Sequence, residues 1–99
     1  MPSRHETYGL VAAEALACGT PVFAHDVGGL RTIVNDGVDG RLLPDLDPVH
    51  WAEALARVQH GAPLAWRSAA AQTGAHRGWD ATARTLLALY ARLEQPRAA

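Results

Sequence analysis

The chain has 99 residues, which is enough for one small domain with a modest hydrophobic core. Its formal net charge is −1, so it lacks the basic excess of proteins that bind nucleic acid or an anionic membrane. Cys18 is the single cysteine, which excludes a disulfide framework and a cysteine-based metal site.

The first 24 residues predict a loop, a helix, a tight turn and a strand. Pro2 is typical of a loop, whereas residues 10–18 are almost all apolar or alanine and predict a helix. Gly19 stands where a helix ends on a left-handed residue. The apolar run 21–24 then predicts a short buried strand.

Glu14 is the only charged residue within that predicted helix. We expect its carboxylate to be solvent-accessible, and we expect Leu10, Ala13 and Leu16 to be among the packed residues. Cys18 follows an apolar run, so we interpret it as a buried, inert thiol.

The rest of the chain predicts one more strand and four more helices. Asp47 followed by Pro48 is typical of an N-cap and a first helical residue. The large aromatic residues are interpreted as packing residues rather than as a platform for stacking sugars; they are Trp51, Trp66, Trp79 and Tyr90. The predicted elements are a helix over 30–35, a strand over 41–43, a helix from 48 to 60, a helix over 63–72, a loop over 74–78 and a last helix capped by Asp80, with an apolar stripe of Ala83, Leu86, Leu87, Tyr90 and Leu93.

Two carboxylates flank the start of the first helix. Glu6 lies in the loop before it, and Glu14 lies about one turn inside it. The first N–H groups of a helix have no partner within the helix, and with the helix dipole they form an anion site. Because a carboxylate accepts hydrogen bonds from paired hydroxyls, the pattern fits a nucleoside-diphosphate sugar. The alternative is that both carboxylates are simply solvated, as most glutamates are.

A longer pattern surrounds these carboxylates. Residues 2–22 are similar to the E-x7-E region of retaining glycosyltransferases of group 1 (family 4), which have the GT-B fold. The match extends to Val27-Gly28-Gly29-Leu30, Asp36-Gly37-x-x-Gly40, Leu42-Leu43-Pro44, Asp47-Pro48 and Trp79-Asp80-x-x-Ala83-x-x-Leu86-Leu87-x-x-Tyr90. The double glycine at 28 and 29 lies near the donor site in that family, although a turn that needs small residues explains it equally well.

The resemblance implies an α/β fold: a partial Rossmann-like domain with short parallel strands and covering helices. Residues 1–99 would form one partial domain, the C-terminal portion of the domain that binds the nucleotide sugar. Glu6 would be the catalytic residue that holds hydroxyls of the transferred sugar, and Glu14 would bind the ribose. The backbone over Tyr8, Gly9, Leu10 and Val11 would meet the donor sugar and the diphosphate.

The resemblance also sets the expected partners. The substrate would be a nucleoside-diphosphate sugar, with no cofactor and no metal; the five histidines show no metal-binding spacing. The acceptor domain and the first strands of the donor domain are missing, so we expect the isolated chain to be inactive. It would need the missing N-terminal domain or a second copy of itself. We expect a cytoplasmic location, with no nucleic acid and no integral membrane segment. The alternative function is a non-catalytic module that binds a nucleotide or sugar, or that only self-associates.

Overall fold

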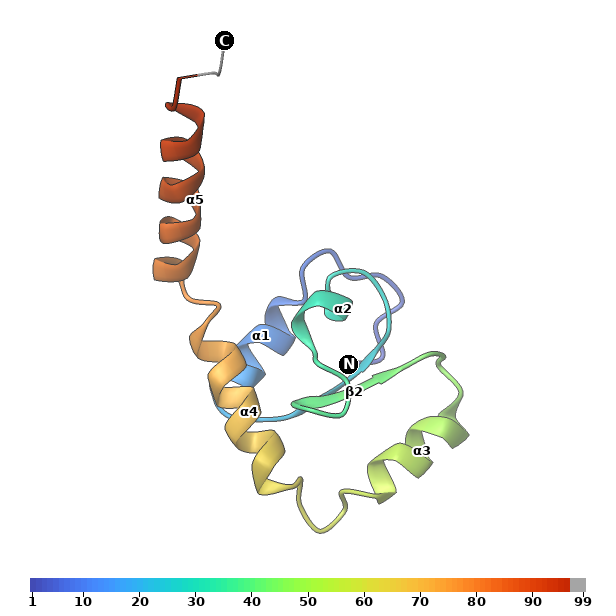
Figure 1. Ribbon diagram of the computed structural model, residues 1–99. Helices are drawn as coiled ribbons and strands as arrows, with labels where there is room; N and C mark the ends of the chain where they lie inside the picture. The colour runs from blue at the N-terminus through green and yellow to red at the C-terminus, as the bar shows by residue number, and fades with distance from the viewer. Residues whose placement is uncertain (97–99) are drawn as a thin grey trace.

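Two parallel strands lie at the centre of the structure, a computed structural model that describes residues 1–96. Helices connect and flank these strands (Figure 1). In chain order the elements are α1 (Leu10–Ala17), β1 (Val22–His25), α2 (Leu30–Ile33), β2 (Gly40–Leu43), α3 (Pro48–Ala56), α4 (Leu64–Ala75) and α5 (Trp79–Leu93).

The two strands pair in register from Val22 with Gly40 to His25 with Leu43. Gly40 is required at this point because a Cβ atom there would stand 1.9 Å from the carbonyl oxygen of Val22. On the other edge of β1, the amino group of Met1 donates to the carbonyl oxygen of Phe23 at 2.7 Å. The carbonyl oxygen of Met1 accepts from the backbone N–H of His25 at 3.0 Å. Met1 therefore forms with β1 the hydrogen bonds of a parallel strand pair, one to the residue before and one from the residue after its partner position.

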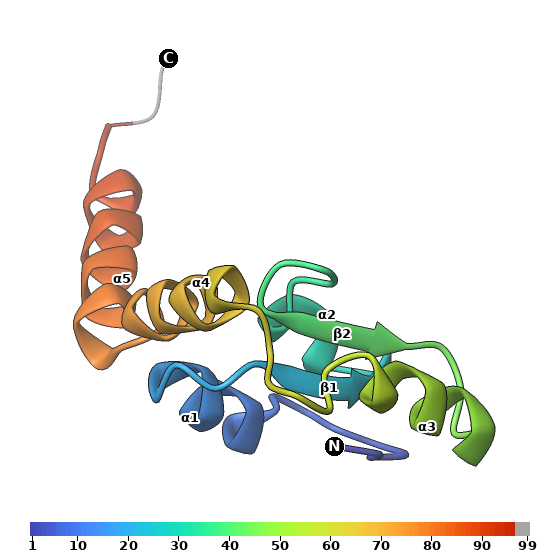
Figure 2. The ribbon, with the colours of Figure 1, turned by 90° about the horizontal axis from the view of Figure 1, so that it is seen from below.

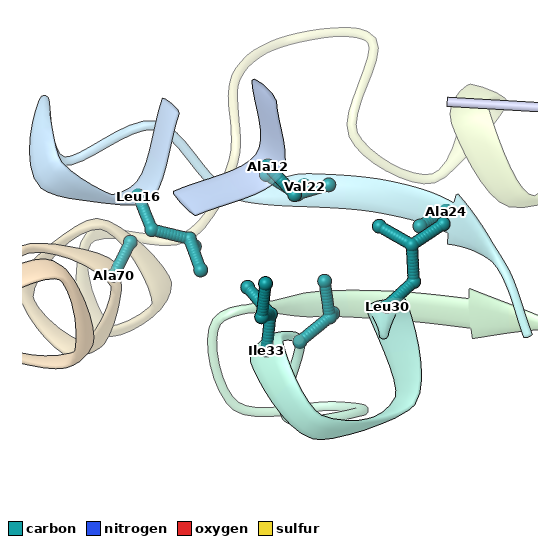
Figure 3. Close-up of a cluster of buried hydrophobic side chains, with 8 residues drawn as sticks. Ala12, Leu16, Val22, Ala24, Leu30, Ile33 and Ala70 are labelled. Atoms are coloured by element: carbon teal, nitrogen blue, oxygen red, sulfur yellow. The ribbon is translucent and has the colours of Figure 1, made fainter. Parts of the chain in front are cut away.

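The core is a single cluster between the sheet and helices α1, α2 and α4. Leu16 of α1 faces Ala70 of α4, while Leu30 and Ile33 point from α2 toward the strands (Figure 3). Helices α1 and α4 lie side by side (Figure 2). The buried apolar residues are Ala12, Leu16, Val22, Ala24, Leu30, Ile33, Val34, Leu43 and Ala70.

Helix α5 stands away from this core, as Figures 1 and 2 show. None of its residues is buried. The radius of gyration is 16.9 Å, compared with roughly 13 Å for a compact domain of about 100 residues. The accessible surface is 7113 Å² for 10.5 kDa, whereas a compact monomer of that mass exposes about 5,400 Å². The molecule thus exposes surface that a complete domain would cover.

The order of the elements agrees with the sequence prediction, and several local signals are confirmed. Gly19 has φ +75°, and its N–H donates to Leu16 while that of Thr20 donates to Ala15, which satisfies the last carbonyls of α1. The carboxylate of Asp47 accepts from the N–H of Val49 and caps α3. The first strand is displaced by one residue from the predicted run 21–24.

Other local predictions were wrong. Helix α4 continues to Ala75, so only a short turn separates it from α5. Gly78, not Asp80, is the N-cap of α5, and Asp80 lies in the first turn. Leu10 is 60% exposed because it faces outward at the start of α1. Cys18 is exposed because it lies at the end of α1, where the chain leaves the core.

Candidate functional site

The loop that carries Glu6 is held against the double glycine. The backbone N–H of Gly29 donates to the carbonyl oxygen of Glu6 at 3.0 Å. A Cβ atom at Gly28 would stand 1.8 Å from that same oxygen, and one at Gly29 would stand 2.4 Å from the carbonyl oxygen of Tyr8. Both glycines are thus required by close contact with the Glu6 loop, which supports the steric explanation of this motif.

A salt bridge braces the segment that carries the double glycine. Nε of Arg31 lies 2.8 Å from Oδ1 of Asp26, and the hydroxyl of Thr32 donates to the carbonyl oxygen of Gly29 at 2.8 Å. On the other side, Nδ1 of His25 lies 2.7 Å from the carbonyl oxygen of Ser3. The loop at residues 1–9 is therefore tied to the carboxyl end of β1, where ligands of open α/β sheets bind.

The N-terminus of α1 is open. Gly9 is its N-cap, with φ +91°, and no side chain caps this end. A Cβ atom at Gly9 would stand 3.0 Å from Cδ2 of Leu30, so α2 packs directly beneath it. The first turn contains no acidic residue. The N–H groups of Leu10 and Val11 consequently remain available to an anionic group.

Glu14 is exposed on α1, as expected. Within residues 1–96 its carboxylate makes no hydrogen bond or ion pair. Glu14 lines a groove of about 650 Å³, a volume typical of small-molecule sites. The groove is bounded by Tyr8, Leu10, Ala13, Glu14 and Ala17 on one side and by Gly74, Arg77, Gly78, Trp79 and Thr82 on the other.

This groove unites some of the predicted site residues and not others. Tyr8, Leu10 and Glu14 line it together. Glu6 and Val11 do not line it: Glu6 is half-buried in the loop before the helix, and Val11 is 62% exposed. The six predicted residues thus surround the start of α1, but they do not share one pocket.

Sequence reasoning missed the second wall of the groove. Arg77 carries no recognisable signal, and its guanidinium donates to the carbonyl oxygen of Thr32 across the fold. Trp79 was interpreted as a packing residue, yet it is 87% exposed. Its place in the family pattern was the one available signal.

Asp39 is a buried carboxylate that does not line the groove. It is fully buried and accepts three hydrogen bonds of 2.7–2.8 Å. Two come from the backbone and side chain of Asn35, and the third comes from the hydroxyl of Thr73 on α4. Asp39 therefore joins the turn before β2 to the helix that packs on α1.

Comparison with known proteins identifies the class of protein that has this fold. The sequence pattern of a family described as "Glycosyl transferases group 1" matches residues 1–60. A sucrose-phosphate synthase from Thermosynechococcus elongatus superposes with a TM-score of 0.71 and 39% identity, over 93% of this chain and 24% of that chain. The fold is thus a partial Rossmann-like domain of the GT-B type, as the sequence predicted.

The chain belongs to the group 1 glycosyltransferases. It is 50% identical over 95 residues to a D-inositol 3-phosphate glycosyltransferase of Streptosporangium roseum, which is 92% of this chain and 21% of that protein. It is 46% identical over 101 residues to the enzyme of the same description from Xylanimonas cellulosilytica, over 100% of this chain and 24% of that protein. The chain therefore spans between a fifth and a quarter of these relatives.

No helix within residues 1–96 is long and apolar enough to cross a membrane. In the same part of the chain, no group of three or more histidine, cysteine, aspartate or glutamate residues is placed to hold a metal ion.

Proposed function

We propose that this chain is the part of a retaining glycosyltransferase that binds a nucleoside-diphosphate sugar. Residues 1–99 form the C-terminal portion of the donor-binding domain. The observation that carries the proposal is the open N-terminus of α1, which has no capping side chain and no acid in its first turn. A helix end of this kind attracts a phosphate, and Glu6 and Glu14 lie on either side of it.

In this proposal the N–H groups of Leu10 and Val11 meet the diphosphate, because this end of α1 has no capping side chain. Glu14 accepts hydrogen bonds from the ribose hydroxyls, and Glu6 does the same for the transferred sugar. Tyr8 lies between them, with half of its surface exposed beside the sugar.

The catalytic part of the proposal concerns the charge that develops on the leaving diphosphate. Helix N–H groups that already point at this position stabilise the transition state without reorganising. The chain alone provides one side of the donor cleft, so it binds the donor but does not transfer the sugar. Transfer requires the remaining domains of a longer glycosyltransferase, and the assembly acts in the cytoplasm.

Isothermal titration calorimetry of the 99-residue chain with UDP and with GDP tests the proposal. We expect saturable binding of at least one of the two nucleotides. Uridine, which lacks the phosphates, should bind more weakly because it makes no contact with the start of α1. If neither UDP nor GDP binds at millimolar concentration, this chain is not a donor-binding module.

The second candidate function is self-association without a nucleotide. The exposed apolar side chains of α5 favour it, since Leu87 is 67% and Leu93 is 72% exposed. Exposed apolar patches of this kind mark interfaces. Measuring the mass of the chain in solution separates this candidate from a monomeric nucleotide-binding module.

A further inference from the structure

The imidazole of His25 reaches from the end of β1 to the loop that carries Glu6. Nδ1 of His25 lies 2.7 Å from the carbonyl oxygen of Ser3. Because a carbonyl oxygen only accepts hydrogen bonds, Nδ1 must carry a proton and donate it. The ring therefore bonds to the loop three residues before Glu6, and in a neutral ring Nε2 is the nitrogen without a proton.

The backbone holds His25 in place on both sides. Its N–H donates to the carbonyl oxygen of Met1 at 3.0 Å, and its carbonyl oxygen accepts from the N–H of Val27 at 2.8 Å. The N–H of the next residue, Asp26, donates to the carbonyl oxygen of Leu43 at 2.8 Å. The ring thus projects from the end of a paired strand, which places a side chain more precisely than a free loop does.

The segment from Ser3 to Glu6 is bonded at both of its ends. The ring holds the carbonyl oxygen of Ser3, and the N–H of Gly29 donates to the carbonyl oxygen of Glu6 at 3.0 Å. Both donors belong to the stretch 25–29 that follows β1. Removing the ring donor would leave Gly29 as the single hydrogen-bond donor from that stretch to residues 3–6.

The carboxylate of Glu6 depends on this backbone support. Glu6 is half-buried, and within residues 1–96 its carboxylate makes no hydrogen bond or ion pair. Its direction is consequently set by the path of the loop and not by a neighbouring side chain. A group that recognises a ligand has to be held within about 0.5 Å of its productive position.

We propose that His25 is the positioning residue for Glu6, and that it sets the affinity for the sugar of the donor without changing the affinity for the nucleotide. This inference rests on the proposed function, in which Glu6 binds the transferred sugar. His25 acts through the loop and touches no ligand. The helix end assigned to the diphosphate is held separately, since Gly9 packs on Leu30 of α2.

Two substitutions separate the ring from its donor. His25→Asn keeps an N–H donor near the position of Nδ1 and removes the ring, whereas His25→Phe keeps a ring of similar shape and removes the donor. His60→Asn, at an exposed position after α3, is the matched control.

Calorimetry of each variant with UDP-glucose and UDP, and with GDP-mannose and GDP, gives the quantity to compare. This quantity is the dissociation constant of the nucleotide sugar divided by that of its nucleotide, for the pair that wild type binds more tightly. An unchanged affinity for the nucleotide also shows that a variant is folded.

We expect His25→Phe to raise this ratio roughly fivefold, as for the loss of one hydrogen bond, with the nucleotide affinity within about twofold of wild type. His25→Asn and His60→Asn should leave the ratio unchanged. Glu6→Gln should raise it roughly tenfold, since it weakens the sugar contact itself. Adding His25→Phe to Glu6→Gln should raise it no further, because the two residues act through the same contact.

Nuclear magnetic resonance of the free chain tests the hydrogen bond without a ligand. In mildly alkaline solution the ¹⁵N signals of the His25 ring should show the proton on Nδ1. His25→Phe should shift the backbone amide of Glu6, and His60→Asn should not. A neutral ring with its proton on Nε2 would overturn the inference, because a bare Nδ1 has nothing to donate to Ser3.

The outcomes separate this inference from the function on which it rests. If nucleotides and nucleotide sugars bind but His25→Phe leaves the ratio at the wild-type value, the positioning role is wrong and donor binding stands. Rescue by phenylalanine and not by asparagine would assign His25 to packing alone. If His25→Phe weakens UDP as much as UDP-glucose, the effect is not confined to the sugar. If wild type binds neither nucleotide, both proposals fall.

Discussion

Gly28 lies directly against the backbone of Glu6: a Cβ atom at Gly28 would stand 1.8 Å from the carbonyl oxygen of Glu6. The two residues belong to loops that are more than twenty positions apart in the chain. Their contact positions the carboxylate that we assign to the donor sugar. The glycine thus contributes to the candidate site by letting the Glu6 loop lie close to it, and not by touching a ligand itself.

Substituting Gly28→Ala should therefore displace the Glu6 loop. Gly28 has φ +51°, so an alanine there also carries backbone strain of about 1–3 kcal/mol. Gly37→Ala is the matched control, because Gly37 has φ +77° but nothing lies within 4 Å of its added Cβ atom. In urea unfolding we expect a clearly larger loss of stability for Gly28→Ala. Equal losses would mean that the contact with Glu6 contributes nothing beyond strain.

Glu14→Gln should weaken the binding of UDP or GDP roughly tenfold, since a hydrogen bond to a charged group contributes about 1.5–3 kcal/mol. Calorimetry of the variant and of wild type measures the effect. Glu53→Gln, on the exposed face of α3, is the control and should bind as wild type does. An unchanged affinity in Glu14→Gln would remove this carboxylate from the site.

Thr73→Val removes one of the donors to the buried carboxylate of Asp39. Oγ1 of Thr73 lies 2.8 Å from Oδ2 of Asp39. We expect the free energy of unfolding to fall by about 1.5–3 kcal/mol, because the hydrogen bond is to a charged group. Thr85→Val removes an exposed hydroxyl that bonds only to Ala81. This control should stay within about 0.5 kcal/mol of wild type. A similar small effect of both substitutions would show that the Asp39 network does not hold α4 in place.

The pair of His50 and Asp45 should make the attachment of α3 depend on pH. Nδ1 of His50 lies 2.8 Å from Oδ2 of Asp45. The hydrogen bond to Asp45 raises the pKa of His50 above its ordinary value. The pKa of Asp45 is lowered, first by the N–H of Asp47 and then by His50.

The sign of the dependence follows from these directions. The stabilisation from His50 is fully present below its unfolded pKa of roughly 6.5 and is lost as pH rises through the raised folded pKa. The stabilisation from Asp45 is present above its unfolded pKa of roughly 3.9 and is lost as pH falls through the lowered folded pKa. The pair therefore contributes most in mildly acidic solution.

Titration of the His50 ring signals by nuclear magnetic resonance measures this effect. In Asp45→Asn the pKa of His50 should return most of the way to its ordinary value. Asp47→Asn should lower the pKa of His50 less, because Asp47 acts only through its charge, with its Oδ2 3.9 Å from Nε2 of His50. A His50 pKa that stays raised in Asp45→Asn would contradict the assigned cause.

The exposed stripe of α5 should make the isolated chain associate. We expect sedimentation equilibrium to give a dimer or a higher oligomer, with contacts through Leu86, Leu87 and Tyr90 or through the strand edge near residues 21–24. Leu86→Glu should shift the equilibrium toward monomer if α5 forms the contact. Ala88→Glu, about 200° further round the helix, is the control. A species of 10.5 kDa that is independent of concentration would refute the association.

Local sequence signals predicted most element boundaries within a few residues. Gly19 ended α1 and Asp47 capped α3, since each acts through bonds within its own turn. The capping role of Asp80 was wrong, because the helix had already begun at Trp79. Whether a residue caps a helix depends on the backbone conformation on both sides of it. The residue type alone does not define that conformation.

Burial was the less predictable property. Leu16 packs as expected, but Leu10, Cys18 and Trp79 are exposed although each is a residue type that proteins usually bury. Their exposure depends on where α1 begins and ends and on where α5 stands. Apolar composition shows that a side chain tends to avoid water, but it does not show whether another part of the chain reaches it.

The sequence by itself determined the order of strands and helices, the group 1 glycosyltransferase pattern and the two carboxylates eight positions apart. Periodicity and turn residues act over a few positions, so they can be read along the chain. Only the tertiary structure decided that Gly28 and Gly29 press against the Glu6 loop, that Asp39 bonds to Thr73, and that Trp79 lines the groove of Glu14. These relationships join residues from about 20 to 65 positions apart, and they arise because packing of the helices on one another and on the sheet brings distant backbone segments into contact.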